Sequence, residues 1–217
     1  TDATDGIVKD EHHDAIMLVQ KSDVDCREVA IAMWAHEEDA GVQMLGCCAI
    51  ARLLEESNKN DGVDSQASTL TDTTLRTALT ATASVVNAMK AHPNEMIVQE
   101  KACLALHLLA PADGRREVSM VASGAVASVV AAMQAEGVAS TAKHFIGDGG
   151  TLRGDDRGDT SMPLDELVAI HGQGYVEAID QDVMSVMASF NIWYVENIHG
   201  SADILTDLLR DEMGFEA

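Results

Sequence analysis

Lys143 and His144 are consecutive residues at the end of a short apolar stretch, and several glycines follow them. The stretch GVASTAKHFIGDGGT covers residues 137–151, and Asp148 lies among its closing glycines. Lys offers several hydrogen-bond donors and His one donor and one acceptor, while glycine lets the backbone turn tightly beside them. A cation, an imidazole and a carboxylate that lie so close together are candidates for binding a polar ligand.

The elements around this pair follow the order of a parallel α/β sheet. Apolar spacing predicts strands over 137–145 and 183–190, the second of them buried, and helices over 164–178 and 203–213, the last capped by Gly214. In such sheets, binding groups gather where strands end and βα loops begin. Lys143 and His144 lie at such a point.

The first half of the chain repeats itself. The segment MWAHEEDAGVQMLGCCAIARLL (33–54) returns as MKAHPNEMIVQEKACLALHLL (89–109), offset by 56 residues, and SVVNAM (84–89) returns as SVVAAM (128–133). In each copy the apolar residues fall on one helical face, which must stack on a neighbouring copy to be buried. Residues 55–75, rich in Ser, Asn, Asp and Thr, predict a loop insertion between the copies.

This pattern resembles armadillo-type repeats over roughly residues 24–136. The resemblance implies an all-α solenoid, and such solenoids bind partner proteins along a concave face. A protein partner is therefore expected along the repeat region.

Composition narrows the class of protein. Hydrophobic residues make up 47% of the chain and aromatic residues 3%, which favours helices packed through small aliphatic side chains. The net charge of -22, without a Lys/Arg cluster, argues against nucleic-acid binding. The longest apolar run, residues 124–133, is too short to cross a bilayer, and no signal peptide is recognisable. We expect a soluble protein without membrane contact, and the compartment stays open.

The cysteines show no zinc-ligand spacing, and they are Cys26, Cys47, Cys48 and Cys103. Three of them fall on apolar helical patterns, which predicts free, buried thiols. No metal and no cofactor is expected.

Residues 137–217 resemble glycoside hydrolase family 3, of the β-glucosidase and β-xylosidase type. The resemblance rests on the 137–151 stretch, RGDT (157–160), SVMASFNIW (185–193), HGSADILTDLLRDEMGF (199–215), and His171 before Tyr175. It implies a partial α/β barrel of TIM type that acts on β-linked glucosides or xylosides with retention.

The resemblance also implies roles for single residues. Lys143 and His144 would bind the hydroxyl groups of the sugar in the cleavage subsite, and Met187 and Phe190 would line the same pocket. Asp148 is singled out by its position in the loop after His144, where we expect it to support His144 or to bind a hydroxyl itself. From the residue types alone, packed strand ends explain these positions better than a binding role does. Three further acids, Asp155, Asp156 and Asp159, read as a solvated loop.

Retaining glycosidases need two carboxyl groups about 5–5.5 Å apart. By the resemblance, the nucleophile follows the Gly214–Phe215 element a few residues past Ala217, and the acid/base lies further downstream. No catalytic residue is therefore predicted within these residues, and we expect an incomplete family 3 glycosidase that is inactive alone.

Two readings of the function stay open. In the first, residues 1–136 form an armadillo-like helical region and residues 137–217 a family 3 barrel fragment of a glycosidase. In the second, the chain is an armadillo-type interaction module that carries a non-catalytic glycosidase fragment.

Overall fold

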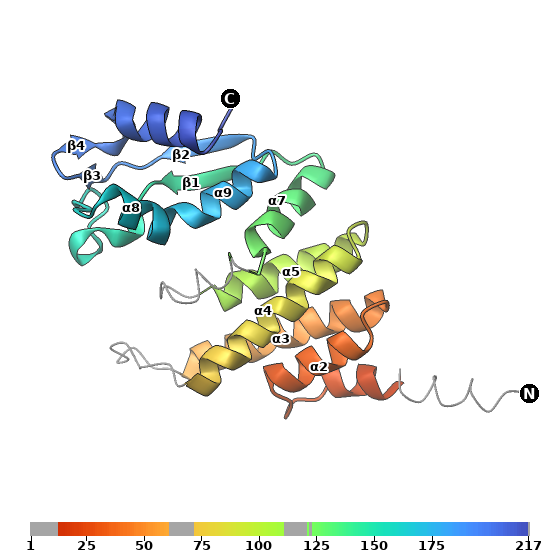
Figure 1. Cartoon of the computed structure of the whole chain (residues 1–217). Coiled ribbons are helices and arrows are strands. Elements are labelled where there is room, and N and C mark those ends of the chain that lie inside the picture. Colours follow the sequence, from red (N-terminus) through yellow and green to blue (C-terminus); the bar gives the residue numbers. More distant parts are fainter. Residues whose placement is uncertain (1–12, 61–71, 111–120, 122, 217) are drawn as a thin grey trace, which may run out of the picture. The chain divides into compact units, whose positions relative to one another are not determined.

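The computed structural model describes residues 13–60, 72–110, 121 and 123–216 (Figure 1). The chain forms two compact units, residues 1–125 and 126–217. The described part of the first, the helical unit, contains helices, and the second, the mixed unit, adds two small sheets. Among the described residues, none of the helices combines the length and hydrophobicity that a membrane span needs.

The helical unit includes the helices α2 (Cys26–Ala35), α3 (Ala40–Asn60), α4 (Asp72–Ala91) and α5 (Met96–Leu109). A capping box begins α2, because the Asp25 carboxylate accepts from the Glu28 N–H at 2.8 Å and the Glu28 carboxylate accepts from the Asp25 N–H at 3.1 Å. The predicted loop over 55–75 is wrong at both ends, since α3 runs to Asn60 and α4 starts at Asp72. Polar residues are tolerated in exposed helical turns, so a polar composition alone does not mark a loop. Residues 61–71 lie outside the described part.

The repeat in the sequence is also a repeat of contacts. The Gln43 side-chain amide donates to Met33 O at 2.8 Å and to His36 O at 2.7 Å. At the equivalent positions, 56 residues later, the Gln99 amide donates to Met89 O at 2.9 Å and to His92 O at 2.8 Å. Each glutamine thereby satisfies two carbonyl groups at the end of the preceding helix, which such ends leave without helical partners.

The mixed unit contains α7 (Ala125–Ala135), β1 (Thr141–Phe145), α8 (Leu164–Leu167), α9 (Gln173–Asp180), β2 (Ser185–Ala188), β3 (Ile192–Trp193) and β4 (Glu196–Asn197). A π-helical turn, Val168–Gly172, joins α8 to α9, and a π-helix spans Asp203–Glu212. The two helices expected from the sequence are thus confirmed, and Gly214 ends the second with a φ of 78°.

The strands β1 and β2 pair in parallel, while β3 and β4 form a short antiparallel pair. The predicted order of a parallel α/β unit is confirmed for β1 and β2. The core of the unit contains Phe145, Ile146, Leu167, Ile198 and Ile204, with Val186 of β2 packed against it.

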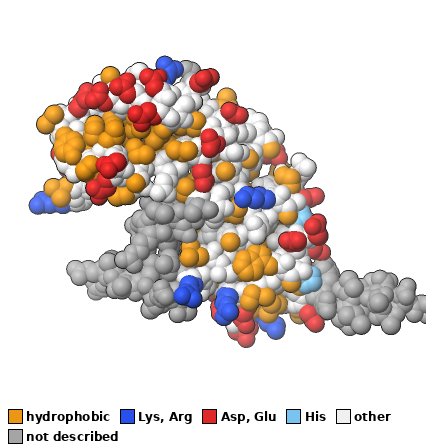
Figure 2. All heavy atoms as spheres, viewed as in Figure 1, with side chains coloured by type: hydrophobic (Ala, Val, Ile, Leu, Met, Phe, Trp, Pro, Cys, Tyr) orange, Lys and Arg blue, Asp and Glu red, His pale blue; other side chains and the backbone are white. Residues whose placement is uncertain are grey.

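The stretch 183–190 is not the buried strand that its apolar residues predicted. Val183 is buried, but Met184 is 62% exposed and Met187 is 43% exposed. Successive side chains of a strand face opposite sides, so only the side of Val186 packs on the core. On the face shown in Figure 2, the mixed unit carries a patch of hydrophobic side chains with acidic side chains around it.

All four cysteines are free, as the sequence predicted. Only Cys47 is fully buried, while the other three are half-buried. The prediction of burial therefore holds for one of them.

Candidate functional site

The carboxyl ends of β1 and β2 place two loops at one edge of the parallel sheet. Lys143 lies opposite Met187 and Phe145 opposite Ala188, with an irregularity of the register between them. The peptide bonds Lys143–His144 and Phe145–Ile146 are cis. Because parallel strands end at the same edge, the residues that follow each strand share one location.

His144 and Asp148 contact each other at this edge. The distance from His144 Nδ1 to Asp148 Oδ2 is 2.9 Å, and the two side chains are 41% and 44% exposed. When Nδ1 carries the hydrogen, it donates to the carboxylate and leaves Nε2 as an acceptor. The pair therefore offers solvent a histidine with a fixed orientation.

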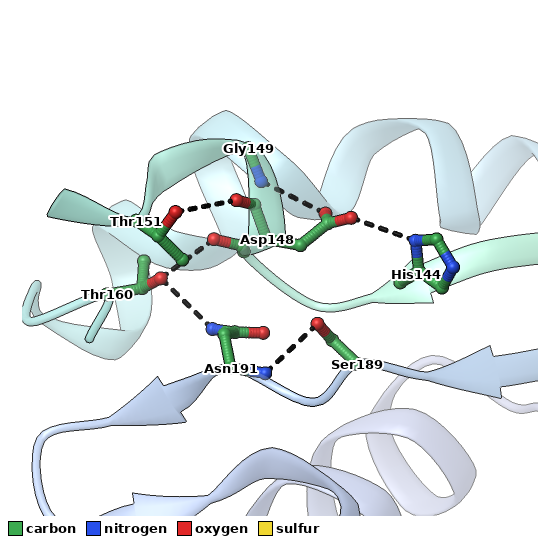
Figure 3. A network of polar contacts seen from close by, with 8 residues as sticks. His144, Asp148, Gly149, Thr151, Thr160, Ser189 and Asn191 are labelled. Carbon is green, nitrogen blue, oxygen red and sulfur yellow. Dashed lines mark hydrogen bonds and ion pairs between the residues drawn. The ribbon is translucent and has the colours of Figure 1, made fainter. Parts of the chain in front are cut away.

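A tight turn holds Asp148, and we call residues 147–150 the Asp148 turn. Its ends are joined by a bond from Gly150 N to Gly147 O at 3.0 Å. The Gly149 N–H donates to Asp148 Oδ1 at 3.0 Å, and the Thr151 hydroxyl donates to Asp148 O at 3.2 Å. One oxygen of the carboxylate is thus bound within the turn, and the other faces His144 (Figure 3).

Two glycines of this turn have no room for a side chain. Gly147 has a φ of 90°, and a Cβ there would lie 2.8 Å from Leu167 Cδ1. At Gly150 a Cβ would lie 2.6 Å from His171 Nε2, so the imidazole of His171 packs directly on the turn. The glycines singled out in the sequence therefore serve close packing as well as backbone freedom.

The remaining predicted residues have separate contacts. Lys143 is exposed and neighbours the partly exposed Met187 across the sheet. Phe190 is 58% exposed, and its ring contacts that of His199 with centroids 4.9 Å apart. His144 and Asp148 are thus joined by a hydrogen bond, Lys143 and Met187 are neighbours in the sheet, and Phe190 contacts a residue outside the predicted group.

Of the three further acids, Asp155 and Asp156 are exposed, as expected for a solvated loop. Asp159 is half-buried instead, and its Oδ2 accepts from the Ser161 hydroxyl at 2.6 Å. The difference arises because Asp159 bridges to Ile192, which draws this end of the loop against the unit.

Tyr175 of α9 lies beneath the site. Its ring meets that of Phe145 edge to face, with centroids 4.9 Å apart. Burial, and to a smaller extent the charge of Asp148, raise the pKa of the Tyr175 phenol above its ordinary value of 10.0. The phenol therefore stays protonated and neutral throughout the physiological range.

Sequence reasoning missed two buried polar residues behind the site. Thr160 and Asn191 are both 0% exposed, and they are hydrogen-bonded to each other. They belong to the RGDT and SVMASFNIW blocks, which were singled out without a role for either residue. A buried polar residue needs a partner, but the sequence does not reveal which one it has.

The segment that contains these residues is similar to a known protein family. Residues 116–217 match the family model described as Glycosyl hydrolase family 3 N terminal domain. A search of curated proteins gave no match.

Two solved structures of an exo-1,3/1,4-beta-glucanase (ExoP) from a Pseudoalteromonas species, one of them of a point mutant, are similar to part of the chain. Each is 42% identical over 44% of this chain, with a TM-score of 0.42, and the match covers 17% of one glucanase chain and 13% of the other. The chain thus spans less than a fifth of either glucanase. Residues 116–217 are thus similar to the N-terminal domain of glycosyl hydrolase family 3.

Proposed function

We propose that the mixed unit binds the terminal sugar of a β-linked glucoside or xyloside at the edge formed by the ends of β1 and β2. The observation that carries the proposal is the His144–Asp148 contact of 2.9 Å, which lies within the segment that matches the family model. Lys143 and His144 bind sugar hydroxyl groups, Asp148 orients His144, and Met187 and Phe190 form the apolar wall.

The chemistry of a pyranose fits these groups. Each hydroxyl both donates and accepts hydrogen bonds. It accepts from the Lys143 ammonium and donates to His144 Nε2. The partly exposed Met187 and Phe190 offer apolar surface for the C–H faces of the ring. Both kinds of contact are available at one sheet edge without a metal or a cofactor in the binding step.

The proposal assigns binding, and not bond cleavage, to the residues named. Hydrolysis with retention requires a pair of carboxyl groups, and the resemblance expects both from sequence that follows Ala217. We therefore propose that the 217 residues bind the sugar and do not hydrolyse it. Hydrolysis of a nitrophenyl β-glucoside by this chain, lost on His144→Ala, would contradict that division.

Calorimetric or NMR titration with methyl β-D-glucoside tests the binding site. We expect Lys143→Met and His144→Gln each to weaken binding roughly tenfold, since a lost hydrogen bond to a polar ligand costs about 1–2 kcal/mol. Asp148→Asn should weaken it less, because it acts through His144.

Asp155→Asn is the matched control, because it removes an exposed carboxylate of the same loop without touching the His144 contact. Equal losses in Asp148→Asn and Asp155→Asn would show that only the net charge of the loop matters. The assigned roles would then be wrong.

A second candidate function rests on the helical unit. We propose that residues 1–136 form an armadillo-type solenoid that binds a protein partner, and that residues 137–217 form part of a TIM-type barrel. The equivalent bonds of Gln43 and Gln99 support the repeat. If the protein serves only as an interaction module, limited proteolysis should remove the residues beyond 137 and leave a stable N-terminal core.

A further inference from the structure

A chain of buried hydrogen bonds joins the carboxyl ends of β1 and β2 behind the site. Asn191, which follows β2, donates through Nδ2 to Thr160 Oγ1 at 3.0 Å. Thr160 in turn donates to the carbonyl oxygen of Gly147 at 2.8 Å, and Gly147 follows β1. We call Asn191, Thr160 and Gly147 the relay (Figure 3).

The chemistry of the three groups fixes the direction of the relay. A carbonyl oxygen only accepts, so the single hydroxyl hydrogen of Thr160 must point to Gly147. The hydroxyl oxygen is then left to accept, and only the NH₂ side of the Asn191 amide can donate to it. Asn191 is consequently held in one orientation, although its Oδ1 is buried without a hydrogen-bond partner among the described residues.

Such a buried, unpartnered oxygen is unfavourable, and native proteins contain few of them. Turning the amide over would move Oδ1 to a new position but would break the bond to Thr160. The structure therefore keeps the hydrogen bond from Asn191 to Thr160, although this orientation leaves Asn191 Oδ1 without a partner.

The far end of the relay lies at the Asp148 turn. The Gly147 carbonyl that accepts from Thr160 also accepts from Gly150 N, so it closes the turn that carries Asp148. Asp148 then meets His144 at 2.9 Å. The segment that carries Asn191 is tied to the same strand end, because Ser189 N donates to Phe145 O and Asn191 N donates to Ser189 Oγ at 3.4 Å.

We infer that Thr160 and Asn191 are positioning residues, which hold the Asp148 turn against the end of β2 and so fix the hydrogen bond and tautomer of His144. Neither side chain is exposed, so neither touches a ligand. The consequence for sugar affinity rests on the proposed function, whereas the consequence for His144 does not.

The test compares two variants of Thr160 in the full chain. Thr160→Val keeps the shape and removes the hydroxyl, while Thr160→Ser keeps the hydroxyl and removes the methyl that packs near Gly147 and Gly150. The first readout is the pair of ¹⁵N shifts of His144, which report the tautomer. The second is the affinity for methyl β-D-glucoside.

We expect Thr160→Val to lose the single-tautomer signature of His144 and to bind the glucoside about threefold more weakly, a smaller loss than for His144→Gln because Thr160 acts through His144. Thr160→Ser should retain both, and so should the control Ser161→Ala, whose hydroxyl bonds to Asp159 instead. Unchanged His144 shifts in Thr160→Val would overturn the inference. Equal effects of Val and Ser would also overturn it, because packing rather than the hydroxyl would then be responsible.

Asn191→Asp keeps the test decisive if Thr160→Val does not fold. Its carboxylate cannot donate, so the Thr160 hydroxyl must turn toward it and give up its hydrogen bond to the Gly147 carbonyl. We expect the single-tautomer signature of His144 to be lost. Retention of that signature in a folded variant would overturn the inference. If the unaltered chain does not bind the glucoside, the sugar proposal fails. If Thr160→Val then loses the single-tautomer signature of His144 while Thr160→Ser keeps it, the positioning role is still supported.

Discussion

The helical unit and the mixed unit use side-chain amides in different ways. In the helical unit, Gln43 and Gln99 each donate twice to backbone carbonyls, at equivalent positions of the two repeat copies. In the mixed unit, Asn191 donates to a hydroxyl that passes the connection on to the turn beside His144. The contacts that recur with the repeat hold a helix end in each copy, whereas the contact at the strand end connects to the turn beside a half-exposed histidine of the candidate site.

This contrast also provides separate probes for the two units. The chain has two tryptophans, Trp34 in the helical unit and Trp193 in the mixed unit. In a Trp193→Phe background, fluorescence reports the helical unit, and in a Trp34→Phe background it reports the mixed unit. All four cysteines belong to the helical unit, so thiol labelling reports that unit alone.

The largest expected effect concerns Cys47 of α3. Burial, with a smaller effect of Cys48 and Cys103, raises the pKa of the Cys47 thiol from its ordinary value of 9.0 to about 12. Because the thiolate is the reactive form, we expect iodoacetamide at pH 8 to label Cys47 roughly a thousandfold more slowly than an exposed cysteine. Mass spectrometry of the labelled peptide measures the rate, and denatured protein is the control.

The same pKa shift makes the stability of the helical unit depend on pH. Unfolding restores the ordinary pKa, so above pH 9 the unfolded thiol ionises while the folded one stays protonated. The stabilisation is therefore fully present below pH 9 and is lost as the pH rises towards 12. A Cys47→Ala variant whose stability falls equally over this range would contradict the assignment to Cys47.

The next largest effect is expected for Gln43→Glu. The substitution keeps the shape but removes both donors and places a carboxyl group against the carbonyls of Met33 and His36. We expect it to lower the free energy of unfolding of the helical unit by about 4 kcal/mol, measured by urea denaturation with Trp34 fluorescence.

Gln99→Glu is the matched variant in the second copy. Gln99 is half-buried whereas Gln43 is 2% exposed, so the loss should be smaller, about 2 kcal/mol. A larger loss at Gln99 than at Gln43 would show that burial does not set the strength of these contacts.

In the mixed unit, an effect between those of Gln43→Glu and Gln99→Glu is expected for Gly147→Ala. The substitution places a side chain on a backbone with a φ of 90° and a Cβ only 2.8 Å from Leu167 Cδ1. We expect the free energy of unfolding of the mixed unit to fall by about 3 kcal/mol, measured by urea denaturation with Trp193 fluorescence. Gly154→Ala separates the two causes, because Gly154 has a φ of 70° with nothing within 4 Å of the added Cβ. It should cost about 1 kcal/mol; equal losses at the two glycines would contradict the role of packing.

The smallest effect is expected for Asp25→Ala at the start of α2. The variant removes the carboxylate that caps the Glu28 N–H at 2.8 Å, which should cost the helical unit about 1 kcal/mol. Asp23→Ala, three residues outside the helix, is the control and should leave stability unchanged. A comparable loss in both would point to net charge rather than capping.

Periodicity and motif were sufficient to predict the helices, the repeat and the parallel pairing of β1 with β2. They were insufficient for the length of α3 and α4 and for the burial of 183–190. Those features depend on which neighbours pack on a helix end or a strand face, and a local pattern carries no such information.

The contacts among the candidate residues were predictable to a similar degree. Residue type and spacing pointed to His144 and Asp148, and the structure joins them. The contact between Thr160 and Asn191 could not be predicted, because the two residues lie far apart in sequence and meet only when the strands are paired. The contact of Phe190 with His199 had no signal in sequence for the same reason.

The exposed side of β2 has a further consequence for the behaviour of the protein in solution. Met184, Met187 and Phe190 are exposed apolar side chains in and next to β2, which pairs only with β1 among the described residues, and such surfaces draw copies of a protein together. The net charge of -22 opposes that encounter, because like-charged molecules repel before their surfaces touch. In about 1 M salt, where the Debye length falls to roughly 3 Å, this repulsion vanishes and self-association should follow.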